Sequence, residues 1–263
     1  MDRPIPPGMA RTLCAAVILM IAASTTQALA AGEPPEAGRA RVTVLNTASF
    51  FRCHFAWRTT QVRRASGELE LVGVTPQWGR APKLAKARHV TCTPPPPKDW
   101  ASPDFDDSAW VRARGPFFTR KCPQWTLLCL RGKFHVPDPA RAGDLALSLS
   151  FRGGAVVYVN GREVSRSHLP KGKLDPLAPA DDYPKDAYAD PDGYLLRWVG
   201  FGDPEKYGGR FLLRTRHVAN LKVPASMLRK GLNVLAVEVH RAPTAAILFT
   251  GKPRQHTRRY TVW

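Results

Sequence analysis

Residues 144–166, DLALSLSFRGGAVVYVNGREVSR, contain the clearest fold signal in the chain. From Leu145 to Phe151 large apolar residues alternate with Ala and Ser, which places every second side chain on one face of a strand, toward a core. Residues 155–159 are a second β-type run. Asn160 and Gly161 follow it and favour the positive φ angles of a type I′ hairpin turn. This stretch predicts antiparallel strands joined by tight turns.

Similar short runs recur along the chain, bounded by turn residues, and almost nothing repeats at helical spacing. The last run is apolar on both faces at its start, before Glu238 and His240 make one face polar, which predicts an interior position in a sheet. Residues 94–97 are four prolines, which cannot continue a strand ladder. We interpret them as a crossover within one domain, because the part before them is too small to bury a core. We expect strands at residues 42–45, 49–59, 68–73, 131–136, 144–151, 155–159, 163–166, 210–216 and 233–241.

The first thirty residues have the layout of a secretory signal peptide: Arg3 and Arg11, an apolar run over residues 13–23, and the small residues Ala28-Leu29-Ala30. The apolar run is shorter than the ~20 residues that a membrane-spanning helix needs, and no later stretch is long enough. We therefore expect cleavage after Ala30 and an exported protein without a transmembrane segment, located in the periplasm, at the cell surface or outside the cell.

The predicted layout is a signal peptide at 1–30, a flexible linker at 31–41 and one β-sandwich at 42–250. The sandwich divides into first strands and the Pro-rich crossover (42–98) and a core (99–250) that carries a loop insertion at 167–209. Residues 251–263 form a C-terminal tail that ends in a β-type run, which favours the start of a truncated region.

Four cysteines follow the leader, and an even number in an exported chain predicts disulfides. Cys122 and Cys129 are close enough in sequence to close a loop, which leaves Cys53 with Cys92, although three pairings are open in principle. Because no Cys-x-x-Cys spacing accompanies them, we favour disulfides over a zinc site and expect no metal.

The formal net charge of the chain is +18, and loss of the leader lowers it by one unit. A field of this sign favours polyanions such as acidic polysaccharide, an anionic cell surface or nucleic acid. The basic residues are scattered, however, and no long Lys/Arg block occurs, so we favour a solvated basic surface over a dedicated polyanion site.

Several motifs follow one another in a characteristic order: Trp100-Ala-Ser-Pro-Asp-Phe-Asp-Asp-Ser-Ala-Trp110, Gly115-Pro-Phe117, Val157-Tyr-Val-Asn-Gly-Arg-Glu-Val164, and residues 223–241 with Gly231-Leu-Asn233. In this order they resemble the sugar-binding, galactose-binding-like jelly-roll domain of family 2 glycoside hydrolases of the β-galactosidase and β-glucuronidase type. The resemblance implies an all-β jelly-roll β-sandwich with a long loop insertion. It covers roughly residues 100–241.

The motif residues also have roles in folding that do not depend on the family. Asp106, Asp107 and Ser108 can accept backbone N–H bonds in a turn, with Phe105 and Trp110 packed beneath it. Fold alone does not give function. The structural motif residues are Trp100, Asp106, Asp107, Trp110, Asn160, Gly161, Gly231 and Asn233.

Catalysis by such glycosidases resides in a pair of carboxylates on a separate (β/α)₈ barrel. No barrel pattern and no Gly-x-Ser-x-Gly nucleophile turn is present. We therefore expect no catalytic residues and no cofactor in this chain.

The aromatic residues of the loop insertion are the candidate ligand site, because aromatic faces flanked by polar groups suit sugar rings. The alternative, weighed equally, is that the insertion caps the open end of the sandwich. Our hypothesis is a noncatalytic carbohydrate-binding or accessory module. The alternative is a purely structural sandwich that packs on a catalytic domain or partner protein. The candidate ligand-binding residues are Tyr183, Tyr188, Tyr194, Arg197, Trp198 and Tyr207.

Overall fold

The computed structural model describes residues 42–74, 84–86, 92–117, 124–196, 205 and 208–252. Thr43–Trp263 forms one compact unit. Its described strands pair antiparallel with their neighbours and build an all-β sandwich, which confirms the predicted fold class. The leader and linker lie outside the described residues and stay predictions.

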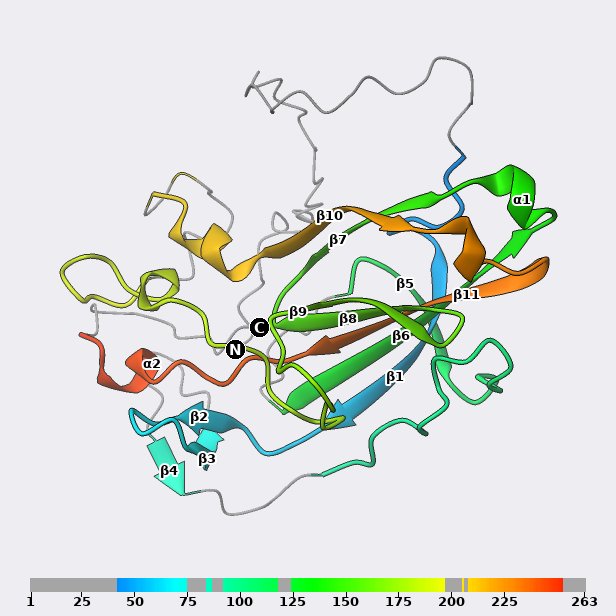
Figure 1. Ribbon diagram of the computed structural model, residues 1–263. Helices are drawn as coiled ribbons and strands as arrows, with labels where there is room; N and C mark the ends of the chain where they lie inside the picture. The colour runs from blue at the N-terminus through cyan, green and yellow to red at the C-terminus, as the bar shows by residue number, and fades with distance from the viewer. Residues whose placement is uncertain are drawn as a thin grey trace, which may run out of the picture. The chain divides into compact units, whose positions relative to one another are not determined.

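The larger sheet has the strand order β5-β1-β6-β11-β8-β9 (Figure 1). β11 lies between β6 and β8, the interior position that its apolar start predicts. Val234 and Ala236 on one face and Val237 on the other are all buried. The strands are β1 Phe50–Trp57, β5 Val111–Arg114, β6 Trp125–Val136, β8 Gly154–Val159, β9 Arg162–Ser167 and β11 Gly231–His240.

The second layer is the pair β7 Leu145–Phe151 and β10 Arg216–Val223, which lie side by side across one face of the larger sheet (Figure 1). The alternating leucines of β7 point inward as predicted, and Leu149 packs against Leu128, Leu130 and Val237 of the larger sheet. We call this apolar face of the larger sheet the inner face, and the opposite one the outer face.

Smaller elements surround the sandwich. A third sheet joins β2 Gln61–Arg63, β3 Leu69–Val74 and β4 Leu84–Lys86. Two single-turn α-helices and three short 3-10 helices complete the described part: α1 Pro139–Ala142, α2 Ile247–Thr250, η1 Lys185–Ala187, η3 Arg210–Arg214 and η4 Ala225–Met227.

Two predicted strands are wrong. Residues 42–45 form no strand, and residues 210–214 form the 3-10 helix η3, closed by the N–H of Leu212 on Gly209 and of Thr215 on Leu212. The strand of this region, β10, begins only at Arg216. Its pairing with β7 shifts between Val218 and Leu221, where Asn220 has a φ of 51°. That bulge breaks the alternation by which a strand is found in sequence.

The expected hairpin turn lies between β8 and β9. Asn160 has a φ of 49° and Gly161 a φ of 81°, as a type I′ turn requires. The Asn160 side chain also fixes the start of β11, because its Oδ1 accepts the N–H of Val234 at 2.9 Å and its Nδ2 donates to Asn233 at 2.8 Å. Gly231 has a φ of 89°, which lets the chain turn into β11.

The predicted pairing of Cys53 with Cys92 is wrong, because Cys53, Cys92 and Cys129 are free thiols. Cys92 lies opposite Arg58, five residues beyond Cys53 along the chain, or roughly 17 Å in an extended strand, whereas a disulfide needs Cα atoms within about 7 Å. Cys129 packs on the outer face and Cys53 on the inner face. Cys122, the fourth candidate, lies outside the described residues, and its predicted pairing with Cys129 is wrong because Cys129 is a free thiol.

Gly153 lies between β7 and β8, directly before the first residue of β8, and contacts the end of β11. A Cβ at this position would lie 1.8 Å from the carbonyl oxygen of His240, so only glycine fits. Its N–H donates to the hydroxyl of Tyr183, and its carbonyl accepts a bond from Arg216 at 2.7 Å. Three separate segments therefore meet at this residue.

Candidate functional site

The loop insertion builds a small core of its own. Tyr183 and Tyr188 are 7% and 2% exposed and pack in a cluster with Leu169, Leu195 and Leu248. Their rings therefore face protein rather than solvent, and neither presents a face to a sugar. This is the arrangement that the capping interpretation describes.

Two arginines cover the tyrosine rings of this cluster. The guanidinium carbon of Arg216 lies 4.3 Å from the centre of the Tyr183 ring, and that of Arg214 lies 4.4 Å from the centre of Tyr188. Arg214 also donates twice to the carbonyl of Ala187, at 2.9 and 2.7 Å. Burial raises the pKa of Tyr188 to about 12 and lowers that of Arg214 to about 10. These contacts hold the insertion together.

The structure does not gather the six predicted ligand residues into one described site. Tyr194 is 37% exposed, with the amine of Lys252 5.4 Å from its ring centre. Arg197, Trp198 and Tyr207 lie outside the described residues, so their part in a site stays a prediction.

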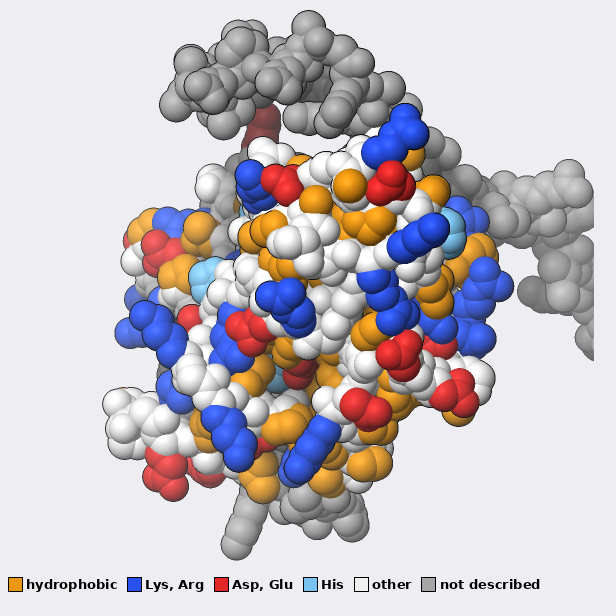
Figure 2. Space-filling view, turned by 45° about the vertical axis from the view of Figure 1, so that its right-hand side comes forward, with side chains coloured by type: hydrophobic (Ala, Val, Ile, Leu, Met, Phe, Trp, Pro, Cys, Tyr) orange, Lys and Arg blue, Asp and Glu red, His pale blue; other side chains and the backbone are white. Residues whose placement is uncertain are grey.

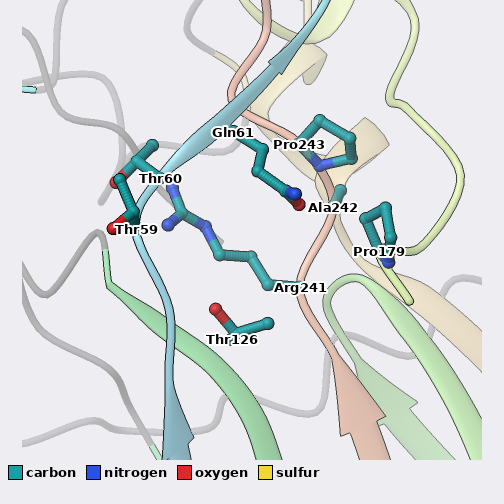
Figure 3. Close-up of a pocket in the computed structure, with 8 residues that line it drawn as sticks. All are labelled: Thr59, Thr60, Gln61, Thr126, Pro179, Arg241, Ala242 and Pro243. Carbon is teal, nitrogen blue, oxygen red and sulfur yellow. The ribbon is translucent and has the colours of Figure 1, made fainter. Parts of the chain in front are cut away.

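A pocket that the sequence did not predict lies where β1 and β11 end and β6 begins (Figure 3). The empty space between its side chains is about 250 Å³, including the part open to solvent. Arg241 crosses the pocket toward Thr59 and Thr60, and Gln61 lies nearer Ala242 and Pro243 (Figure 3). The described lining residues are Thr59, Thr60, Gln61, Thr126, Pro179, Arg241, Ala242 and Pro243.

Main-chain bonds hold the walls of this pocket in place. The N–H of Arg241 donates to the carbonyl of Thr126, and the N–H of Thr244 donates to the carbonyl of Gln61, at 2.9 and 2.8 Å. Arg241 Nη2 donates to Thr244 Oγ1 at 3.1 Å. Arg241 and all three threonines are less than 10% exposed, so the polar groups sit on a rigid support. The described lining contains guanidinium, hydroxyl and amide groups and no carboxylate.

A polar network is buried on the outer face beside the pocket. Glu238 accepts a bond from the Tyr158 hydroxyl at 2.9 Å, and its other oxygen lies 2.8 Å from His240 Nε2. His240 Nδ1 lies 2.7 Å from the carbonyl of Ala178. Burial and the neighbouring carboxylate raise the pKa of Tyr158. We call Tyr158, Glu238 and His240 the Tyr–Glu–His network; Glu238 and His240 are buried beneath the insertion, and Tyr158 is half-buried.

A second polar group, the Asp107 cluster of Asp107, Arg131 and Lys133, lies toward the other end of the outer face. Asp107 accepts bonds from Arg131 Nε at 2.9 Å and Lys133 Nζ at 2.8 Å. Burial alone would raise the pKa of Asp107, but these bonds outweigh it and hold the pKa below the usual 3.8. Arg131, only 1% exposed, also donates to the carbonyls of Trp100 and Ser102.

The Asp107 cluster ties the predicted turn to the sheet. Asp106 Oδ1 accepts the N–H of Ser108 at 2.9 Å, whereas Asp107 turns inward to Arg131. Beneath the turn, Trp100 stacks on Trp110 with ring centres 5.9 Å apart. These motif residues therefore cover the outer face and serve folding.

The described residues lack the features of two other kinds of site. No helix there is long and apolar enough to cross a membrane. The same ranges hold no group of three or more His, Cys, Asp or Glu side chains placed to bind a metal ion.

No protein-family model and no curated protein matches the chain. Parts of solved structures are similar to part of it. One is a glycoside hydrolase family 2 member from Bacteroides cellulosilyticus, at 16% identity over 53% of this chain and 15% of that chain, with a TM-score of 0.27. Another is a calcium-binding mutant of Bacteroides uniformis β-glucuronidase 2, at 17% identity over 58% and 14%, with a TM-score of 0.33.

A third is a β-glucuronidase from glycoside hydrolase family 2, at 13% identity over 76% of this chain and 15% of that chain, with a TM-score of 0.30. The chain thus spans about 15% of the length of these proteins. A likeness at this level does not assign a function to this chain.

Proposed function

We propose that the chain is a noncatalytic carbohydrate-binding module of an exported glycoside hydrolase or surface protein, and that the pocket around Arg241 holds the sugar. The observation that carries the proposal is the lining of this pocket. A guanidinium, three hydroxyls and an amide converge there from the ends of three neighbouring strands. Such groups donate to and accept from sugar hydroxyls, and buried supports fix their directions.

The size of the pocket limits what it holds. Its empty space of about 250 Å³ includes the part open to solvent, so the enclosed part is far smaller than the ~300–1,000 Å³ of pockets that hold a whole small molecule. The proposal is therefore that the pocket contacts only the edge of a saccharide, with the rest of the sugar in solvent.

The proposal of a noncatalytic role is supported by where the described carboxylates near the pocket lie. Glycoside hydrolysis uses two carboxyl groups that face the substrate at roughly 5–9.5 Å from each other. The described lining of the pocket has none, and nearby Glu238 is bonded to Tyr158 and His240 beneath the insertion. The module binds without cleaving.

The test is binding of the purified protein to an array of neutral and acidic glycans. Gln61→Ala removes the half-buried amide, and Arg241→Lys keeps the charge but loses the planar fork of donors. Each is expected to weaken retention roughly fivefold or more. Ser165→Ala on β9, the far edge strand, is the matched control and leaves retention unchanged. If the wild type retains no glycan, the proposed function is wrong.

A second candidate is packing against a partner domain. Leu212 and Leu213 on η3 are 57% and 45% exposed, an unusual pair of large apolar side chains at the surface of a short helix. Replacing both with Ser leaves glycan retention unchanged if the pocket acts alone. It abolishes co-purification with the downstream part of a longer polypeptide if η3 is the contact.

A further inference from the structure

The outer face of the larger sheet carries a second surface, far from the pocket. We call Phe50, Arg52, Arg112, Arg114 and Lys133 the basic strip; it crosses β5, β1 and β6. Along β1 the strip begins at Phe50 and Arg52, whereas the pocket begins at Thr59. Seven residues of extended chain separate Arg52 from Thr59, which is roughly 24 Å. The two surfaces therefore lie toward opposite ends of the sheet.

The strand register sets cations directly beside each other. Arg52 of β1 pairs with Arg112 of β5 on one side and with Arg131 of β6 on the other, so three arginines form a row across three strands. In the next row Phe50 pairs with Arg114. Like charges directly opposite each other destabilise a sheet. Within the fold, Asp107 and the carbonyl of Trp110, which accepts a bond from Arg52 at 2.9 Å, offset part of this repulsion.

Acidic groups neutralise only part of this charge. Asp107 lies 3.9 Å from Arg52 and is bonded to Arg131 and Lys133, but its side chain is 4% exposed and belongs to the interior. Asp106 is exposed beside Lys133. The four cations of the strip and the buried Arg131 beneath it outnumber these two carboxylates, so the strip presents a net positive charge to solvent.

The exposed arginines are held in place. Arg114 Nε donates to the carbonyl of Ala48 at 2.9 Å. The guanidinium carbons of Arg112 and Arg114 lie 4.3 and 5.5 Å from the centre of the Phe50 ring, which is itself 50% exposed. Ordered guanidinium groups lose less freedom when they bind, and their fork matches a carboxylate or sulfate.

The surroundings of the strip distinguish it from the general basic surface. On the face drawn in Figure 2, lysine and arginine side chains are scattered among hydrophobic ones, with acidic side chains between them. In the strip, by contrast, the register places Arg52 directly opposite Arg112, with Cβ atoms ~5 Å apart, and Arg114 opposite Phe50 in the next row. Several cations grouped on one face favour a ligand that carries more than one negative charge.

We infer that the basic strip binds an acidic polysaccharide through its carboxylate or sulfate groups. A single-stranded nucleic acid is the poorer fit, because base stacking needs a free aromatic face and Arg112 already lies over the Phe50 ring. A duplex is poorer still, since a flat sheet face puts no element into a groove. The inference goes beyond the sugar pocket and stands on different residues.

The experiment measures binding of the purified protein to polygalacturonate, dextran sulfate, uncharged dextran and single-stranded DNA at two salt concentrations. Arg112→Gln/Arg114→Gln removes two exposed cations of the strip and keeps the backbone pairing of β5. Arg141→Gln/Lys171→Gln removes two exposed cations elsewhere and gives the same net charge. Thermal unfolding checks that both double variants are folded.

The expected result is binding to the two acidic polysaccharides that weakens with salt and falls roughly tenfold in the strip variant, with little change in the matched variant. If binding falls equally in both double variants, the affinity comes from the overall charge of the protein, and the proposal that the basic strip is the binding site is wrong. If the protein binds single-stranded DNA more tightly than the acidic polysaccharides, and Arg112→Gln/Arg114→Gln weakens the DNA binding, the polysaccharide is not the ligand of the strip. Gln61→Ala tests only the pocket: it should reduce binding to the glycan array and leave binding to polygalacturonate unchanged. The pocket and the strip can therefore be disproved independently of each other.

Discussion

Asp107 and Glu238 are both buried carboxylates on the outer face of one sheet, yet the Asp107 cluster and the Tyr–Glu–His network respond to opposite extremes of pH. Asp107 has a lowered pKa and is held by two cations, whereas Tyr158 has a raised pKa and donates to a carboxylate. The cluster therefore stabilises the fold when its acid is ionised, and the network does so when its phenol is protonated. The fold should therefore lose stability at acidic pH, where Asp107 becomes protonated, and at alkaline pH, where Tyr158 loses its proton.

The largest expected effect is loss of the Asp107–Arg131 pair. Arg131→Met leaves the Asp107 carboxylate without its buried cation, paired only with the exposed Lys133 and the more distant Arg52, and should lower the free energy of unfolding by about 3 kcal/mol. Urea unfolding at neutral pH measures it. The double variant Asp107→Leu/Arg131→Met should recover part of the loss, because no unpaired charge stays inside. A double variant as unstable as the sum of the two single ones contradicts this account.

The next effect is the loss of stability at acidic pH, which depends on the Asp107 cluster and not on the Tyr–Glu–His network. Because its folded pKa lies below 3.8, Asp107 contributes stability above its unfolded pKa and loses it as pH falls through the folded value. The wild type should therefore lose stability more steeply below about pH 5 than Asp107→Asn, which starts lower and has no acid to protonate. Melting temperatures from neutral to acidic pH give the two slopes. Parallel slopes would exclude Asp107 as their source.

A smaller effect tests the network from the alkaline side. The raised pKa of Tyr158 means that its contribution is complete below the unfolded pKa of 10.0 and is lost as pH rises toward the folded value. Tyr158→Phe keeps the ring and removes the bond to Glu238, with an expected loss of about 1–3 kcal/mol near neutral pH. Above about pH 10 the difference from wild type should shrink. A difference between wild type and Tyr158→Phe that stays constant from neutral to alkaline pH would exclude the Tyr158 phenol as its source.

The smallest effect reports local opening of the network. Cys129 pairs with Glu238 across β6 and β11, and burial and this carboxylate raise its pKa; burial raises the pKa of Cys53 to about 11. Exposed Cys92 should react with a thiol reagent within the mixing time, and both buried cysteines slowly. In Tyr158→Phe the labelling of Cys129, followed by peptide mass spectrometry, should rise relative to Cys53 in the same molecule. Equal acceleration of both indicates global unfolding instead.

The sequence predicts those parts of the fold whose signals are local. The alternation in β7 and the Asn160-Gly161 turn depend on neighbouring residues, and both have the expected geometry. The strand predicted at 210–216 fails because the exposed Leu212 and Leu213 supply apolar residues without a sheet partner. Apolar character alone does not distinguish a strand from a short helix.

The candidate sites were harder to predict, because they depend on register and cover. The pocket joins Thr59, Thr126 and Arg241, which are far apart in the chain and meet only when three strands pair. Polar residues just beyond strand ends were the available signal. Likewise, the sequence pattern predicts that Glu238 and His240 lie on the polar face of β11. It does not predict that the insertion buries this part of the face.

Gly153 has a consequence for the order in which parts of the molecule can open. Its two backbone groups are bonded to Tyr183 of the insertion and Arg216 of β10, and its missing side chain makes room for the end of β11. The insertion therefore cannot detach as a separate unit while the sandwich stays closed at this end. Its inner amides, such as that of Ala180 bonded to the carbonyl of Arg241, should exchange hydrogen at the rate of the central strands rather than at that of a surface loop.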